Sequence, residues 1–136
     1  MPMLEWNDSL SINFSEIDEQ HKNLITMINN LYDIMTLNND SNQSVHDIIS
    51  DLHNYTIEHF GTEEKFMEKY NFPEAPAHIS EHKEFISKIS EVENLCSDAS
   101  DNISMDILNY LSTWIVQHIN DTDKKMGEFI NNQIKN

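Results

Sequence analysis

Apolar residues recur at intervals of three and four along most of this chain, in four stretches that short polar runs separate. After His21, for example, apolar residues follow at offsets of 3, 4, 7, 10, 11 and 14. Such spacing places side chains on one face of an α-helix. The pattern predicts four helices, over about 18–38, 44–70, 75–97 and 103–131, behind an irregular arm at 1–17.

The connections between the predicted helices are short, and polar residues at 38–42 and 97–102 mark two of them. Ser44 is a suitable N-cap for the second helix. Short loops between long helices make neighbouring helices antiparallel. Two glycines and three prolines are too few for an all-β protein. We therefore expect an all-α, single-domain, antiparallel up-down-up-down four-helix bundle with an irregular N-terminal arm.

Five of the seven histidines lie on the predicted core faces, together with two acidic residues. These seven residues are His21, His59, Glu63, His78, His82, His118 and Asp123. In an antiparallel bundle the starts of the first and third helices lie beside the ends of the second and fourth, so all seven should meet at one end. A lone histidine on an apolar face is usually a core residue with its hydrogen bonds satisfied. Buried carboxylates without a partner cost several kcal/mol each, however, and imidazoles with carboxylates suit iron. We predict a metal site.

The remaining histidines and the single cysteine lack this pattern. His46 and His53 point away from the apolar face of their helix and are expected to be solvated. Cys96 lies on the core face of the third helix and is expected to be a small buried hydrophobic residue.

The spacing between His118 and Asp123 does not fit an ideal helix. Residues five apart lie about 140° apart around the axis. Both side chains can reach one centre only if the helix widens locally. We predict a π-type turn within 119–123, a distortion common at functional sites.

The formal net charge of −16, with eight lysines, no arginine and 24 acids, disfavours binding to nucleic acid or to an anionic membrane. No stretch of about 20 apolar residues is present to span a bilayer. The start of the chain lacks the features of a secretory signal, and one cysteine cannot form an internal disulfide. We expect a cytoplasmic protein.

The order H…HxxxE…HxxxH…HxxxxD resembles the hemerythrins. The segments IDEQHK, HFGTEE, HISEH and HINDTD are similar to bacterial hemerythrins in particular, and the resemblance covers almost the whole chain. It implies a non-haem centre of two Fe ions that binds O₂ reversibly. One iron would take His78, His82 and His118. The other would take His21 and His59 and keep an open position.

The resemblance also implies that Glu63 and Asp123 bridge the irons, together with an oxo or hydroxo group from solvent. Reversible binding further requires a dry pocket. Six apolar residues near the predicted centre are candidates to line it, although ordinary core packing explains each equally well: Leu24, Ile25, Phe60, Trp114, Ile115 and Ile119. Ile115, one turn before His118, is the first choice.

The expected function is that of a non-enzymatic O₂ carrier, store or scavenger, with O₂ as partner and a monomeric state. The absence of an attached output module in this sequence favours that reading over an oxygen or redox sensor acting through a partner. A di-iron peroxidase or nitric-oxide reductase would need a proton donor near the open iron. Tyr32 and Tyr55 are the only nearby candidates, and both suit the core. The sequence does not determine the identity of the metal, because such sites also bind Zn, Mn or Co.

Overall fold

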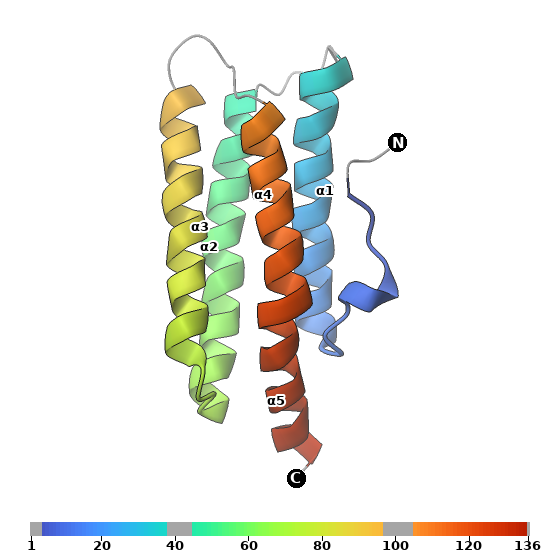
Figure 1. The fold of residues 1–136 in the computed structure, drawn as a ribbon, viewed down its shortest axis with the longest axis vertical. Helices are drawn as coiled ribbons and strands as arrows, with labels where there is room; N and C mark the ends of the chain where they lie inside the picture. Colours follow the sequence, from blue (N-terminus) through green and yellow to red (C-terminus); the bar gives the residue numbers. More distant parts are fainter. Residues whose placement is uncertain (1–3, 38–44, 97–104, 136) are drawn as a thin grey trace.

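The computed structural model describes residues 4–37, 45–96 and 105–135, and these form an antiparallel bundle of four helical rods (Figure 1). The first three rods are single helices: α1 (Ser15–Leu37), α2 (Val45–Tyr70) and α3 (Ala75–Cys96). The fourth rod is continuous but changes type, from α4 (Met105–Gln117) through the π-helix η2 (His118–Asp123) to α5 (Lys124–Lys135). The predicted all-α four-helix bundle is confirmed.

Neighbouring rods pack in a ring, since α2 contacts both α1 and α3, and α4 contacts both α1 and α3. Two helix boundaries differ from the expected ones. The first helix begins at Ser15, because Glu16 and Asp18 in its first turn suit the positive end of the helix dipole. The last rod continues to Lys135, since Phe129 and Ile130 keep the apolar spacing. The predicted cap at Ser44 and the side chain of Cys96 lie outside the described residues.

A tight turn joins α2 to α3 and sets the end of one beside the start of the other. Asn71 follows the last turn of α2 in the left-handed region, with φ of 56°, and asparagine tolerates this conformation better than most residues. The backbone N–H of Phe72 then donates to the carbonyl of Met67 at 2.9 Å, a bond typical of helix C-termini. Pro76 lies in the first turn of α3, where no N–H is required.

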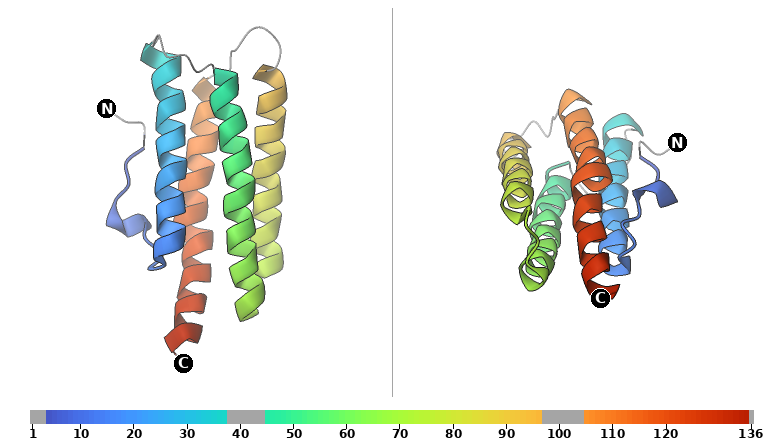
Figure 2. Two further views of the ribbon diagram at one scale, coloured as in Figure 1. Left: turned by 180° about the vertical axis from the view of Figure 1, so that it is seen from behind. Right: turned by 60° about the horizontal axis from the view of Figure 1, so that its bottom comes forward.

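The N-terminal arm runs along α1 and includes a short 3₁₀ helix, η1 (Asp8–Leu10) (Figure 2). Asn29 of α1 exchanges two hydrogen bonds with the backbone of Leu4, each 2.8 Å long. Gly127 of α5 faces the backbone of Ile12, and a Cβ there would come within 2.8 Å of the Ile12 carbonyl oxygen. A glycine is therefore required where the arm crosses α5, and the arm packs onto the bundle as expected.

The hydrophobic core is divided into two clusters with polar residues between them. The larger cluster fills the bundle from Ile48 and Leu108 down to Phe60 and Ile119. The smaller one closes the other end and is formed by Ile12, Ile17, Met67, Phe72, Met126 and Ile130. On every rod the predicted metal-binding residues lie in sequence between members of the two clusters. None of the helices in the described ranges is both long and apolar enough to cross a bilayer.

Candidate metal centre

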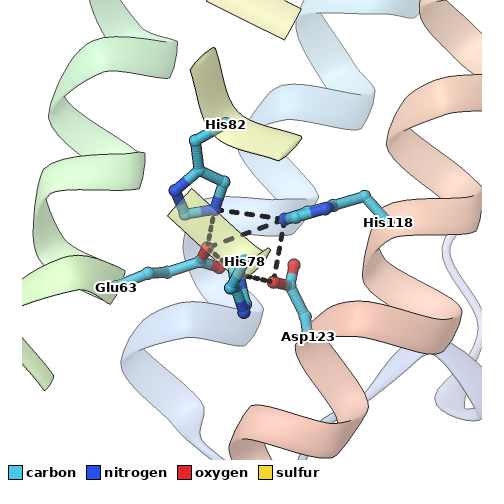
Figure 3. A group of neighbouring side chains, drawn as sticks. All are labelled: Glu63, His78, His82, His118 and Asp123. Atoms are coloured by element: carbon cyan, nitrogen blue, oxygen red, sulfur yellow. Dashed lines mark hydrogen bonds and ion pairs between the residues drawn. The ribbon is translucent and has the colours of Figure 1, made fainter. Parts of the chain in front are cut away.

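All seven predicted metal-binding side chains converge inside the bundle, and each is at most 4% exposed. They come from all four rods, and Figure 3 shows five of them with both carboxylates directed at three imidazoles. Their ligand atoms form two overlapping groups, in each of which these atoms lie within 4.8 Å of one another. Glu63 and Asp123 belong to both groups. The structure thus brings together the seven residues as the sequence predicted.

The two-histidine side of the centre consists of His21 and His59. The Nε2 atom of His21 lies 3.3 Å from Glu63 Oε2 and 3.0 Å from Asp123 Oδ2. The Nε2 atom of His59 lies 3.1 Å from the same Glu63 oxygen. One oxygen of each carboxylate therefore faces this side.

The three-histidine side consists of His78, His82 and His118, and it faces the other two carboxylate oxygens. His82 Nε2 lies 2.9 Å from Glu63 Oε1, and His78 Nε2 lies 3.4 Å from it. Asp123 Oδ1 is 3.0 Å from His78 Nε2 and 3.1 Å from His118 Nε2. Each carboxylate thus presents one oxygen to each side, as a group that bridges two metal ions must.

Several buried atoms at the centre lack a hydrogen-bond partner. They include both carboxylate oxygens of Asp123 and the Nε2 atom of His59. Buried polar atoms without partners cost free energy. Cations held between the carboxylates and the imidazoles would satisfy these atoms, so the donor set fits two metal ions side by side.

Burial and charge oppose each other at these groups. Burial disfavours the charged form of His21, but the adjacent carboxylates of Asp123 and Glu63 raise its pKa to about 9. The same two acids raise the pKa of His78 to about 9, also against burial. Burial would raise the pKa of Glu63, yet the surrounding imidazoles hold it well below its usual range. In the metal-free protein, protonated imidazoles therefore balance the charge of the two carboxylates, as metal ions would in the loaded protein.

A shell of polar residues holds three of the imidazoles by their other nitrogen. His59 Nδ1 lies 2.6 Å from Gln20 Oε1, and His82 Nδ1 lies 2.9 Å from Glu64 Oε2. His118 Nδ1 lies 3.0 Å from Glu81 Oε1, which also accepts a hydrogen bond from the hydroxyl of Thr122. Such contacts orient metal-binding histidines and raise their basicity. The Nδ1 atoms of His21 and His78 are buried without a partner.

This shell was not predicted, although the sequence contains a signal for it. Each of the four residues directly precedes or follows a metal-binding position in the sequence: Gln20, Glu64, Glu81 and Thr122. Successive helical side chains point about 100° apart. A polar residue beside a core-facing ligand is therefore directed towards the neighbouring helix, where it meets another ligand or, for Thr122, the shell residue Glu81.

The π-helix η2 begins at His118 and ends at Asp123. Its wider turns bring two residues five apart onto the same side of the rod, so both face the centre and their side chains lie 3.1 Å apart. The predicted π-type turn is confirmed, in a segment whose residues also include the shell residue Thr122.

Aromatic rings support two imidazoles of the three-histidine side. Phe60 stacks on His82 with ring centres 3.8 Å apart and planes 4° apart. Trp114 stacks on His118 at 4.6 Å and 14°, and its other neighbours include Phe85 at 4.5 Å. These contacts fix the planes of the two imidazoles.

A small cavity of about 10 Å³ adjoins the centre, where both imidazoles of the two-histidine side line it together with His118 and Asp123. Of the six predicted pocket residues, five line it: Leu24, Phe60, Trp114, Ile115 and Ile119. Ile25 is buried in the larger core cluster but does not line the cavity. Thr56 and Phe85 also line the cavity and were not predicted.

The two other histidines lie outside the centre. His53 was expected to be solvated, but its side chain is 18% exposed and its Nδ1 atom lies 2.6 Å from Glu93 Oε2. The expectation was wrong because α3 packs against that flank of α2. His46 is half-buried.

Comparison with known proteins agrees with this geometry. Residues 13–130 match the family model of the hemerythrin HHE cation-binding domain. The chain is 34% identical over 128 residues to a bacteriohemerythrin of Stenotrophomonas maltophilia, covering 94% of this chain and 82% of that protein. It is 32% identical over 123 residues to a bacteriohemerythrin of Pseudomonas aeruginosa, covering 90% and 78%.

Solved structures share the fold. The crystal structure of wild-type hemerythrin superposes with a TM-score of 0.83 at 24% identity, covering 94% of this chain and 98% of that one. A single-residue mutant of hemerythrin gives a TM-score of 0.85 at the same identity, covering 96% and 98%. The family match over most of the chain, with the buried histidine–carboxylate cluster, shows that this chain belongs to the hemerythrin family.

Proposed function

We propose that this protein binds O₂ reversibly at a pair of iron ions held by the seven residues of the centre. One observation carries the proposal: Glu63 and Asp123 each face both sides, while the imidazoles divide three to two. An ion on the two-histidine side would have one protein ligand fewer, and both imidazoles of that side line the small cavity. A diatomic ligand would bind there.

An iron pair supplies the electrons that O₂ accepts on binding and returns on release. The protein's own contribution is to balance charge. Glu63 and Asp123 offset two positive charges, and five neutral imidazoles add none, so the site carries few anions. Less anionic donation stabilises the oxidised metal less than a carboxylate-rich site does, which favours release of O₂ over irreversible oxidation.

The cavity walls keep water away from the bound ligand. Apart from the centre's own residues, Thr56 is the one polar residue among those that line the cavity, and its buried hydroxyl lacks a hydrogen-bond partner. A volume of about 10 Å³ holds roughly one water molecule. Such a site suits a small apolar ligand and leaves little room for a larger substrate.

The polar groups around the cavity favour binding over catalysis. A peroxidase or nitric-oxide reductase would need a proton donor beside the open position. Neither Tyr32 nor Tyr55 lines the cavity, and the Tyr55 hydroxyl instead accepts a hydrogen bond from Asn23 at 3.1 Å. We therefore propose a non-enzymatic role as an O₂ carrier, store or scavenger.

The test is an optical spectrum of the iron-loaded, anaerobically reduced protein before and after exposure to air, then after removal of O₂. Charge-transfer bands that appear in air and disappear when O₂ is removed are expected. A spectrum that never changes, or one that changes once and stays, would contradict reversible binding. Ile115→Ala provides a sharper comparison, because enlarging the cavity admits water and should speed irreversible oxidation.

A further inference from the structure

A second hollow adjoins the centre, on the three-histidine side. It has a volume of about 180 Å³, and its lining includes the carboxylates of Glu74, Glu81 and Asp121 as well as His78. Lys125 is the one basic residue among those that line it. We call this hollow the acidic groove. The role inferred for this groove rests on the proposed function, because it concerns how metal ions reach the centre.

The two hollows beside the centre differ in the ligands that they can admit. The apolar cavity has room for roughly one water molecule, so a divalent ion would have to lose its hydration shell against hydrocarbon walls. That cost is far larger than the cost of admitting a neutral gas. The acidic groove has room for several water molecules and offers oxygen ligands, which suit a hydrated divalent cation.

His78 forms part of both the groove and the centre. Its Nε2 atom lies 3.0 Å from Asp123 Oδ1 inside the centre. The Nδ1 atom is on the opposite edge of the imidazole, and it is buried without a hydrogen-bond partner in a side chain that is 1% exposed. Among the seven residues of the centre, His78 is the one that also lines the groove.

Glu81 connects the groove to the centre in the same way. Its Oε1 atom lies 3.0 Å from the Nδ1 atom of His118, while 42% of its side chain stays exposed. One carboxylate is therefore in contact with solvent and with a residue of the centre at once. Glu74 and Asp121 are exposed and lie at the rim.

We propose that the acidic groove is the route by which ferrous ions enter the centre. The rim carboxylates of Glu74 and Asp121 raise the local concentration of hydrated divalent cations. The carboxylate of Glu81 then binds the ion transiently beside His78, and the ion displaces the proton of His78 as it moves to its final ligands. Lys125 opposes this attraction, and its ion pair with Asp121 is long, at 3.9 Å, and solvent-exposed. Gas and metal thus reach one centre through two different hollows.

The experiment measures the rate at which metal-free protein takes up Co²⁺, followed by its visible absorption after rapid mixing, and the final metal content by elemental analysis. The test variant is Glu74→Gln with Asp121→Asn. The matched control, Asp51→Asn with Glu91→Gln, removes the same charge from exposed positions elsewhere on α2 and α3. Lys125→Gln removes a positive charge from the groove and should have the opposite effect on the uptake rate.

The groove variant should take up Co²⁺ about fivefold more slowly, because clefts of one charge accelerate binding of the opposite charge. Its final content should equal that of the unaltered protein, since all seven residues of the centre are retained. The control should differ by less than about twofold, and Lys125→Gln should be faster. Rates should converge at high salt.

Two failures can be distinguished. If the groove variant and its control take up Co²⁺ equally fast while both reach full content, the groove is not the route, and the proposed function is unaffected. If the unaltered protein takes up no metal, the proposed function is wrong and this inference fails with it.

Discussion

Histidine–glutamate contacts occur at both ends of the α2–α3 pair, but they differ in what surrounds them. Near the start of α2, His53 and Glu93 form a single contact of 2.6 Å, with side chains 18% and 25% exposed. Near the end of α2, Glu63 is fully buried and lies within 4 Å of all five imidazoles of the centre. The same residue types therefore make a surface ion pair at one end and a metal centre at the other.

The difference shows that a metal site depends less on residue type than on two other features. These are the number of imidazoles that contact one carboxylate and the burial of that carboxylate. At the surface pair the Glu93 carboxylate is partly exposed, and its pKa is lowered mainly by the hydrogen bond with His53. At the centre Glu63 is fully buried, and each of its oxygens contacts more than one imidazole nitrogen. Only multivalent cations, or protons in their absence, balance such a group.

The largest effect should follow from removing the shared carboxylate. Glu63→Ala removes one bridging carboxylate from both sides, so metal affinity should fall by more than about 100-fold. This exceeds the usual loss when a residue that only contacts a metal-binding histidine is removed. Metal content after dialysis, measured by elemental analysis, tests this. Glu93→Ala is the matched control at the other end and should keep full content. Equal metal content in both variants would contradict the comparison.

A smaller loss is expected from the shell around the centre. Glu64→Ala removes the carboxylate that holds His82 by its Nδ1 atom, and should weaken metal binding by about tenfold. Competition with a chelator measures the affinity. Glu68→Ala removes an exposed acid one turn later on α2 and should leave the affinity unchanged. A Glu64 variant that competes as well as its control would show that the shell contact does not orient His82.

The stability of the metal-free protein should depend on pH at the centre. The pKa values of His21 and His78 are raised to about 9, so their stabilising contribution is complete below the ordinary value of 6.5. It is lost as pH rises from there through 9, on the order of 3 kcal/mol for each histidine. Urea unfolding of the metal-free protein at several pH values tests this.

The metal-loaded protein is the control for that pH series, because ions replace protons at the imidazoles and the loss should disappear. The surface pair responds in the opposite direction. The pKa of Glu93 is lowered, so its stabilising contribution is complete above the ordinary value of 4.5. That contribution is lost only as pH falls. A metal-free profile that is flat between pH 6.5 and 9 would mean that protons do not occupy the centre.

The smallest effect should come from the surface pair itself. His53→Ala breaks the contact with Glu93 and should lower the free energy of unfolding by about 1 kcal/mol at most. Metal content should not change. Chemical denaturation with a metal assay on the same samples provides the measurement, and any loss of metal would show that the two ends are coupled.

Much of the centre could be predicted because the chemistry follows helical spacing. His59 with Glu63, and His78 with His82, are four apart, so each pair shares a face on any regular helix. Even the irregular η2 was predictable, because His118 and Asp123 can meet only on a widened turn. The shell was harder to predict, since the partner of each residue lies on another rod: Gln20 holds His59, and Glu64 holds His82.

The sequence by itself determined the four helices, the apolar face of each and the set of residues that face inward together, because period and polarity are local properties of the chain. Only the tertiary structure decided how those residues divide. The side of the centre that each carboxylate oxygen faces, and the hollow that each side adjoins, depend on the relative rotation and height of four packed rods. The same packing excluded Ile25 from the cavity and gave His53 a partner, because exposure is set by the neighbouring helix.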